Sequence, residues 1–228
     1  AENVSKKWDI SRQDQEAFAL ASQTKAARAQ AEGRLKDEIV AIEVDGKTID
    51  TDGGIRPETT LEALAGLKAA FDAAGTVTAG TSSPLTDGAS AVLVCTEEYA
   101  ESRGLTPLAR IRSIATSGCA PECMGIGPVG ATRKALERAG LEVDDLGIVE
   151  LNEAFAVQAL ACIHDLGLDP ETVNFDGGAI ALGHPLGATG ARITGKAAAL
   201  LKREGRKYAL ATQCIGGGQG IATILEAV

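Results

Sequence analysis

Short apolar stretches alternate with stretches of helical character from residue 89 onward, and this alternation constrains the fold more than any other feature. Alternating strands and helices are typical of α/β proteins, in which helices cover the faces of a sheet. The first stretch, residues 89–96, is a run of mostly small apolar residues, which predicts a strand buried on both faces. The other predicted strands are 109–115, 148–151, 208–213 and 221–228, and the predicted helices are 97–103, 128–139, 152–166 and one ending near 204.

The sequence before residue 84 has a different organisation. Ser11 followed by Asp14 offers a capping box at a helix start, and Asp45-Gly46 is typical of a hairpin turn. We place a soft boundary near residues 84–88, with an appendage before it and one compact layered structure after it. The elements predicted in the appendage are a helix over 11–32, a hairpin over 38–49, a short helix over 60–71 and an ordered loop over 76–87.

The composition excludes several classes of protein. The chain has 228 residues, of which 45% are hydrophobic and 23% charged, as in globular proteins rather than disordered ones. Aromatic residues make up 3% and the net charge is −9, which disfavours nucleic acid as a partner. No run approaches the roughly 20 apolar residues of a membrane span. Five cysteines, an odd number, favour an intracellular protein with reduced thiols. Because the chain begins without Met, we expect that the start of a longer protein is missing.

Two motifs have weak functional interpretations. Gly125 to Gly130 matches G-x-G-x-x-G, but the segment does not directly follow a predicted strand and Pro128 lies inside it. A structural lead-in to a helix is therefore favoured over a nucleotide site. Cys119 and Cys123 lie four residues apart without the further ligands that a metal site needs, so we interpret them as incidental thiols.

Three segments combine reactive side chains with loops or helix starts. His184 lies in the Gly-rich segment 177–190, where it either faces a ligand or has a structural role. Cys214 opens Cys-Ile-Gly-Gly-Gly-Gln-Gly, whose backbone N–H groups could form an oxyanion hole; the alternative is a buried Cys before a turn. Asn152 starts a helix after a predicted strand and is either a cap or a ligand-holding amide. Together these groups suit acyl transfer or carbanion chemistry beside a carbonyl.

These segments resemble the signature blocks of the thiolases. The blocks are Asn152 to Phe155, residues 177–190 and residues 214–220, and residues 75–88 resemble the coenzyme A loop of the family. The resemblance runs over essentially the whole chain. It implies a thiolase-like layered α/β fold of two similar halves, with a loop domain inserted in the first. Residues 1–85 would be the C-terminal part of the loop domain, and 86–228 the C-terminal thiolase domain.

The resemblance also implies the activity and the site. Thiolases cleave 3-oxoacyl-CoA with CoA or catalyse the reverse Claisen condensation. For this chain the resemblance implies such a reaction in fatty-acid metabolism. CoA is a substrate, no cofactor is bound permanently and no metal is expected. The catalytic residues implied are His184 as general base, Cys214 as the proton-shuttling second thiol, Asn152 as holder of a water at the enolate oxygen, and Gly216 as an oxyanion-hole donor. Those implied for CoA are Arg56 and Ser83 as contacts, with Ala154 and Phe155 lining the pantetheine tunnel.

Some family features have no counterpart in this sequence. No stretch resembles the block of the nucleophilic cysteine, and none of Cys95, Cys119, Cys123 and Cys162 has that context. The loop-domain His is absent, and Pro84 and Thr81 stand where Gly and Asn are common. We therefore expect this chain to be inactive alone and to need the N-terminal thiolase half as its partner.

The resemblance further implies a cytoplasmic homodimer or homotetramer that acts on acyl-CoA, with no membrane span. Two alternatives remain. One is a non-catalytic thiolase-fold protein that binds acyl-CoA or a lipid. The other is a nucleotide-dependent dehydrogenase, which depends on Gly125 to Gly130.

Overall fold

The computed structural model describes residues 1–228 and divides them into two compact units. Unit 1 comprises Ala1–Thr86, Glu153–Ala161 and Asn174–His184. Unit 2 comprises Asp87–Asn152, Cys162–Val173 and Pro185–Val228. Because both units combine distant segments, they do not test the domain boundary predicted between residues 85 and 86, which stays a prediction.

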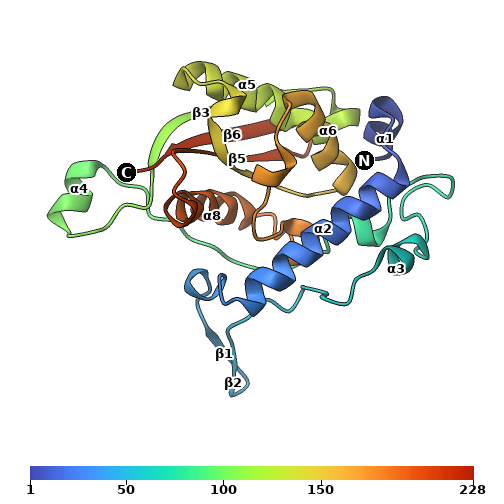
Figure 1. Cartoon of the computed structure of the whole chain (residues 1–228), viewed down its shortest axis with the longest axis horizontal. Helices are drawn as coiled ribbons and strands as arrows, with labels where there is room; N and C mark the ends of the chain where they lie inside the picture. The colour runs from blue at the N-terminus through green and yellow to red at the C-terminus, as the bar shows by residue number, and fades with distance from the viewer. The chain divides into compact units, whose positions relative to one another are not determined.

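Unit 1 is built around the long helix α2 (Figure 1). Ser11 caps α2 through the predicted capping box, since its Oγ accepts the Asp14 N–H at 3.1 Å and the Asp14 carboxylate accepts the Ser11 N–H. Ala19 of α2 packs with Leu64, Ala156 and Ile180 in a buried cluster. The helices of unit 1 are α1 (Glu2–Trp8), α2 (Arg12–Ala31), η1 (Lys36–Glu38), α3 (Leu61–Ala65), η2 (Ala79–Thr81), α7 (Ala179–Leu182) and the first residues of α6 (Ala156–Leu166).

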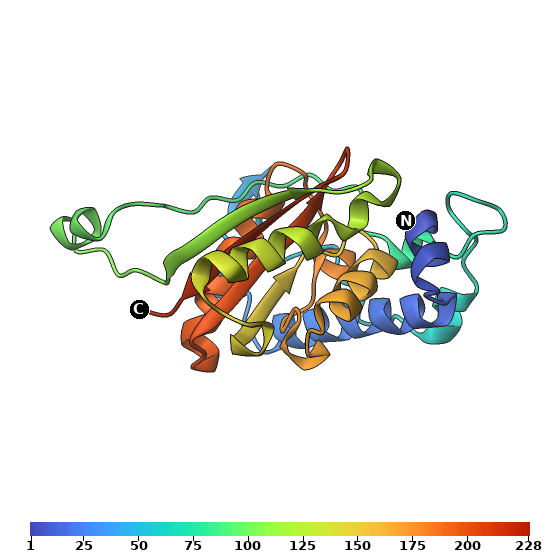
Figure 2. The same ribbon diagram turned by 90° about the horizontal axis from the view of Figure 1, so that it is seen from above.

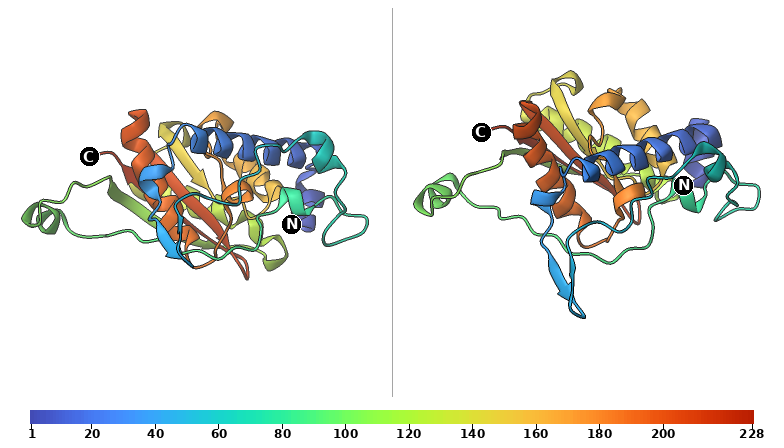
Figure 3. Two further views of the ribbon diagram at one scale, coloured as in Figure 1. Left: turned by 90° about the horizontal axis from the view of Figure 1, so that it is seen from below. Right: turned by 60° about the horizontal axis from the view of Figure 1, so that its bottom comes forward.

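The predicted hairpin is confirmed as β1 (Ile42–Val44) and β2 (Lys47–Ile49), which project from the rest of unit 1 (Figure 3). Asp45 and Gly46 both adopt positive φ, as a tight hairpin turn requires. The helix predicted over 60–71 ends much earlier, at Ala65, because Gly66 follows and the chain then turns away.

Unit 2 contains a four-stranded sheet in the order β3-β6-β5-β4. β4 and β5 are parallel, whereas β6 is antiparallel to both of its neighbours. α5 packs against β3 and β6, and α8 packs against β5 and β4, on the opposite side of the sheet (Figure 1). The strands are β3 (Arg110–Gly118), β4 (Leu146–Leu151), β5 (Tyr208–Ile215) and β6 (Gln219–Glu226). The helices are α4 (Glu97–Ser102), η3 (Pro121–Ile126), α5 (Gly127–Ala139), η4 (Val143–Asp145), η5 (Pro170–Thr172), α8 (Thr189–Glu204) and the end of α6.

The strand predicted over residues 89–96 is wrong. This segment has no regular secondary structure, and Leu93 and Val94 are 71% and 68% exposed. It is extended and runs out from the sheet toward α4 (Figure 2). A strand needs a hydrogen-bonded neighbour, and none of the four strands of the sheet pairs with this segment. Ser90 of this segment anchors it to the start of α8, since its Oγ donates to the Ala188 carbonyl at 2.5 Å.

Candidate functional site

The predicted site residues are divided between the two units. Asn152, Cys214 and Gly216 belong to unit 2. The remaining predicted residues, His184, Arg56, Ser83, Ala154 and Phe155, belong to unit 1.

His184 follows α7 and is held through its backbone. Its N–H donates to Thr86 Oγ1 at 2.8 Å, and the Thr86 hydroxyl donates to the Pro84 carbonyl at 3.1 Å. The preceding Gly183 has φ of 92°, and a Cβ there would lie 2.7 Å from Thr86. Only glycine fits this position without strain, because positive φ and the close threonine both exclude a side chain. His184 itself is half-buried.

A buried carboxylate fixes the segment that leads to His184. Glu153 is 1% exposed and accepts hydrogen bonds from Ser22 Oγ at 2.7 Å, Asn174 Nδ2 at 2.7 Å and the Ile180 N–H at 3.1 Å. Gly178 passes so close that a Cβ would lie 2.2 Å from the Glu153 Cδ. A buried carboxylate needs several donors to offset its lost hydration. Glu153 therefore ties α2, Asn174 and α7 together.

Ser83, Ala154 and Phe155 come together in unit 1. The Ser83 N–H and hydroxyl both donate to the Ala154 carbonyl, at 3.1 and 3.2 Å. Ser82 forms an antiparallel bridge with Phe155 beside this contact. The structure thus joins the predicted CoA loop to the predicted tunnel residues.

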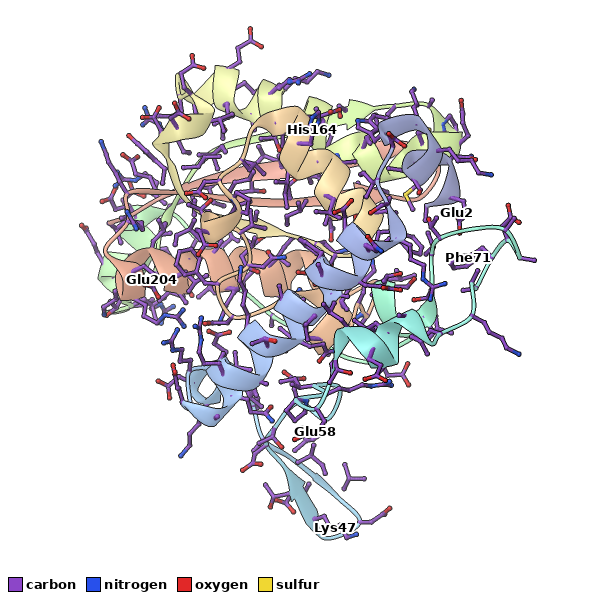
Figure 4. All side chains as sticks on the ribbon, turned by 45° about the vertical axis from the view of Figure 1, so that its right-hand side comes forward. Glu2, Lys47, Glu58, Phe71, His164 and Glu204 are labelled. Carbon is purple, nitrogen blue, oxygen red and sulfur yellow. The ribbon has the colours of Figure 1, made fainter.

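Phe71, the last residue of the helix predicted over 60–71, joins the same group. Its ring meets the Phe155 ring edge to face, with centroids 5.9 Å apart. Phe71 is 65% exposed and lies on the loop after α3 (Figure 4). An exposed aromatic ring supported by a second ring offers an apolar surface to a ligand.

Arg56 is also in unit 1 but hydrogen-bonds elsewhere. Its N–H donates to Gln23 Oε1 at 2.8 Å, and its carbonyl accepts from the Thr59 hydroxyl at 2.7 Å. Its side chain is exposed. These contacts fix the backbone and leave the guanidinium at the surface.

Asn152 and Cys214 lie at the carboxyl ends of neighbouring parallel strands in unit 2. The Asn152 N–H donates to the Thr212 carbonyl at 3.0 Å, which extends the β4–β5 ladder by one residue. Cys214 follows two residues later on β5, opposite Gly220 of β6. The carboxyl edge of parallel strands is where α/β proteins place their sites.

Burial raises the pKa of the Cys214 thiol to about 11. Cys119 of the same unit adds a smaller effect in the same direction. The thiol is therefore neutral near pH 7 and can donate a proton, but it is a poor nucleophile in this state. Gly216 lies in the exposed turn that follows β5.

Cys119 and Gly125 to Gly130 have structural explanations. The Cys119 thiol donates weakly to the carbonyls of Cys123 and Met124 in η3, at 3.8 and 3.7 Å. A Cβ on Gly127 would lie 2.1 Å from the Gln219 carbonyl oxygen, so this glycine lets α5 begin against β6. The G-x-G-x-x-G pattern thus serves packing, as the structural interpretation predicted.

Sequence reasoning missed Thr86, Glu153 and Phe71. Thr86 lies inside the block that resembles a CoA loop, and Glu153 lies inside the block that begins at Asn152. Neither residue has a sequence signal of its own beyond membership of its block. Their roles depend on contacts with residues about 100 and 130 positions away in the chain, at His184 and Ser22 respectively.

Comparison with known proteins gives consistent matches. The thiolase N-terminal domain matches residues 1–98, and the thiolase C-terminal domain matches residues 105–227. An acetyl-CoA acetyltransferase of Shinella zoogloeoides is 54% identical over all of this chain, and the 3-oxoadipyl-CoA/3-oxo-5,6-dehydrosuberyl-CoA thiolase of Escherichia coli K12 is 53% identical. The chain spans about 59% of the length of these curated relatives.

Solved structures agree. Human mitochondrial 3-ketoacyl-CoA thiolase in complex with CoA has a TM-score of 0.94 at 46% identity, with all of this chain and 57% of that chain covered. The Bacillus anthracis acetyl-CoA acetyltransferase has a TM-score of 0.95 at 43% identity, with 59% of that chain covered. The layered α/β fold predicted from the sequence is confirmed. None of the helices in the structure is long and apolar enough to cross a membrane.

Proposed function

The chain belongs to the thiolase family, and from this premise we propose that it is the part of an acyltransferase that transfers acyl groups between acyl-CoA and CoA. The reaction is thiolytic cleavage of a 3-oxoacyl-CoA or the reverse condensation of two acyl-CoA molecules. The observation that carries the proposal is the buried, neutral Cys214 thiol at the carboxyl end of β5, with Asn152 at the carboxyl end of the neighbouring parallel strand β4.

The thiol of Cys214 suits the carbon–carbon step. Cleavage of the bond between C2 and C3 leaves its electron pair on C2 as a thioester enolate. Cys214 gives its proton to C2, which completes acetyl-CoA, while the acyl group stays on a nucleophilic cysteine as a thioester. A thiol with a pKa near 11 holds this proton at pH 7, whereas a carboxylate would already have lost it.

His184 takes the role of general base. It removes the proton from the nucleophilic thiol before that thiol attacks the 3-oxo carbon. We propose that this cysteine lies in the segment of the curated relatives that the present chain does not match. Asn152 holds a water at the enolate oxygen, and the Gly216 N–H donates to the oxygen of the acyl-enzyme.

The CoA substrate is assigned to unit 1. Phe71 and Phe155 offer an apolar surface for the pantetheine, and Ser83 lies against Ala154 beside them. Arg56 offers an exposed cation for the phosphate groups. CoA enters and leaves as substrate and product, and no permanently bound cofactor is required.

A chimera tests the proposal. The segment of the Shinella zoogloeoides enzyme that this chain does not match is joined to the present chain, and the loss of 3-oxoacyl-CoA enolate absorbance is followed with added CoA. We expect CoA-dependent loss in the chimera, and none with the present chain alone or with the His184→Ala chimera. A folded chimera that binds acyl-CoA without turnover would support a non-catalytic acyl-CoA- or lipid-binding protein instead.

We also propose that the enzyme works in fatty-acid metabolism, in the cytoplasm, as a homodimer or homotetramer. Relatives named 3-ketoacyl-CoA thiolase, as in Bacillus subtilis, support the metabolic assignment. None of the five cysteines forms a disulfide bond, which suits a reducing compartment. Cell fractionation and sedimentation of the native protein test these points, and a secreted or monomeric protein would contradict them.

A further inference from the structure

We propose that Thr86 is a positioning residue for His184, and that its hydroxyl links the base to the loop that holds Ser83. The inference deepens the proposed function, because it concerns the residue assigned as the general base. Thr86 itself needs no contact with substrate for this role.

The link is a short chain of hydrogen bonds within unit 1. The His184 N–H donates to Thr86 Oγ1 at 2.8 Å, and the same hydroxyl donates to the Pro84 carbonyl at 3.1 Å. One hydroxyl thus accepts from the residue of the base and donates to the loop. Residue 83, directly before Pro84, is bonded to Ala154 through both its N–H and its side chain.

The Thr86 bond acts on His184 just beyond the helical hydrogen bonds of α7, where the Gly183 N–H donates to the Ala179 carbonyl at 2.8 Å. α7 ends at Leu182, and Gly183 turns the chain with φ of 92°. The Thr86 side chain fills the space that a Cβ on Gly183 would occupy. The hydroxyl of Thr86 therefore holds the His184 N–H, and its hydroxyl and methyl groups pack against the backbone at Gly183.

Position matters for a general base because small displacements have large kinetic effects. A displacement of about 1 Å can cost on the order of 100-fold in rate. Removal of the Thr86 hydroxyl does not alter the imidazole itself. It removes the hydrogen bond that fixes the His184 backbone, and the backbone sets the position of the imidazole. The expected effect is on the rate of acylation and on kcat rather than on the CoA requirement.

Three variants separate the hydroxyl from the shape of the side chain. Thr86→Val keeps the branched shape and removes the hydroxyl, whereas Thr86→Ser keeps the hydroxyl. Thr24→Val is the matched control, since the Thr24 hydroxyl also donates to a backbone carbonyl of unit 1, that of Leu20, within α2. Circular dichroism and thermal unfolding confirm that each variant is folded.

The first measurement uses the present chain and needs no catalysis. Hydrogen exchange of the His184 amide is followed by NMR, together with the ring resonances of the two histidines, with exposed His164 as internal reference. We expect the His184 amide to exchange roughly fivefold faster in Thr86→Val, with a shifted His184 ring signal and unchanged His164. Thr86→Ser and Thr24→Val should resemble the parent chain. Unchanged His184 exchange in Thr86→Val would overturn the proposal.

The second measurement uses the chimera described above. We expect Thr86→Val to lower kcat by roughly 10- to 100-fold, with little change in the CoA concentration for half-maximal rate, and Thr86→Ser to restore most of the activity. Loss of activity in both variants alike would show that the hydroxyl is not responsible. Inactivity of the parent chimera would contradict the proposed function, whereas the exchange measurement would still decide whether Thr86 positions His184.

Discussion

The glycine-rich loop at His184 and the glycine-rich turn that follows Cys214 are held in different ways. The loop before His184 is fixed by side chains from distant segments, with Glu153 bonded to Ser22 and Thr86 bonded to the His184 N–H. The loop after Cys214 is the turn of an antiparallel pair, β5 and β6, whose ladder continues through Cys214 to Ile215. One loop depends on a few polar side chains, and the other depends on a continuous backbone ladder.

This difference predicts different responses to mutation. A polar cluster fails when one member is lost, because its partners remain buried without hydrogen bonds. A backbone ladder survives most side-chain changes, since its bonds use N–H and C=O groups. Substitutions near His184 should therefore affect structure and activity together, while substitutions at Cys214 should affect activity with little loss of structure.

The largest expected effect separates the two loops by their chemistry. In the chimera, His184→Ala should slow acylation by a simple acyl-CoA, because the base is lost. Cys214→Ala should largely spare acylation and stop the carbon–carbon step. Each loss should be on the order of 10²–10⁴-fold. Rapid-quench acylation and steady-state turnover measure the two steps, and equal acylation rates in the two variants would contradict the assignment.

Next in size is the loss of Glu153. In the present chain, Glu153→Ala leaves Ser22, Asn174 and the Ile180 N–H without their buried acceptor. We expect unfolding free energy to fall by about 3 kcal/mol, and by less in Glu153→Gln. Denaturant unfolding measures this loss, with exposed Glu58→Ala as a control that should change by under about 0.5 kcal/mol. If Glu153→Ala lowered the unfolding free energy as little as the control does, the His184 loop would not depend on its buried polar side chains as proposed.

A matched substitution tests whether the turn after Cys214 tolerates a side chain. Gly216 has open space around the position of a Cβ and does not adopt positive φ. Gly216→Ala should therefore change the unfolding free energy by less than about 1 kcal/mol. A loss as large as that of Glu153→Ala would show that the turn is as fragile as the His184 loop.

The raised pKa of Cys214 gives the third effect, on stability against pH. The folded pKa of about 11 lies above the ordinary thiol value of 9.0, so the folded state binds this proton more tightly than the unfolded state. The contribution is complete below pH 9 and is lost as pH rises from 9 to 11. The loss amounts to roughly 2–3 kcal/mol. Unfolding free energies at pH 8 to 11 should decline less steeply in Cys214→Ala, and identical slopes would contradict the buried neutral thiol.

A smaller effect, on CoA binding, is expected at Arg56. Because its side chain is exposed, a contact with a CoA phosphate should contribute about 1–2 kcal/mol, and less at high salt. Arg56→Ala in the chimera should raise the CoA concentration for half-maximal rate roughly tenfold, with kcat little changed. A normal CoA requirement would show that Arg56 points elsewhere.

Local signals in the sequence were sufficient for many elements of the fold. Pro128 near the start and Gly140 after the end predict α5 closely, because both residues act on the backbone where they stand. Residues 89–96 show the limit of such signals. They have the apolar character of a buried strand, as β4 has, but β4 pairs with β5 and residues 89–96 pair with no strand of the sheet. Whether an apolar segment forms a strand depends on whether another strand lies next to it, and the sequence of the segment alone does not show this.

The same distinction applies to the site. His184, Cys214 and Asn152 could be proposed from local sequence because reactive groups beside glycines or at helix starts are visible in it. Their catalytic roles stay predictions. Thr86 and Phe71 could not be found this way, since a hydroxyl in a loop and an apolar residue at helical spacing have common structural uses. Only their contacts with His184 and Phe155 distinguish them.

The central claim is that Cys214 donates a proton and does not carry the acyl group. Peptide mass mapping of the chimera, quenched shortly after mixing with an acyl-CoA, tests it most directly. We predict an acyl group on a cysteine of the segment taken from the Shinella zoogloeoides enzyme, and none on the five cysteines of the present chain, while the enzyme turns over. An acyl group on Cys214, or on Cys95, Cys119, Cys123 or Cys162, in a sample that turns over would contradict the account.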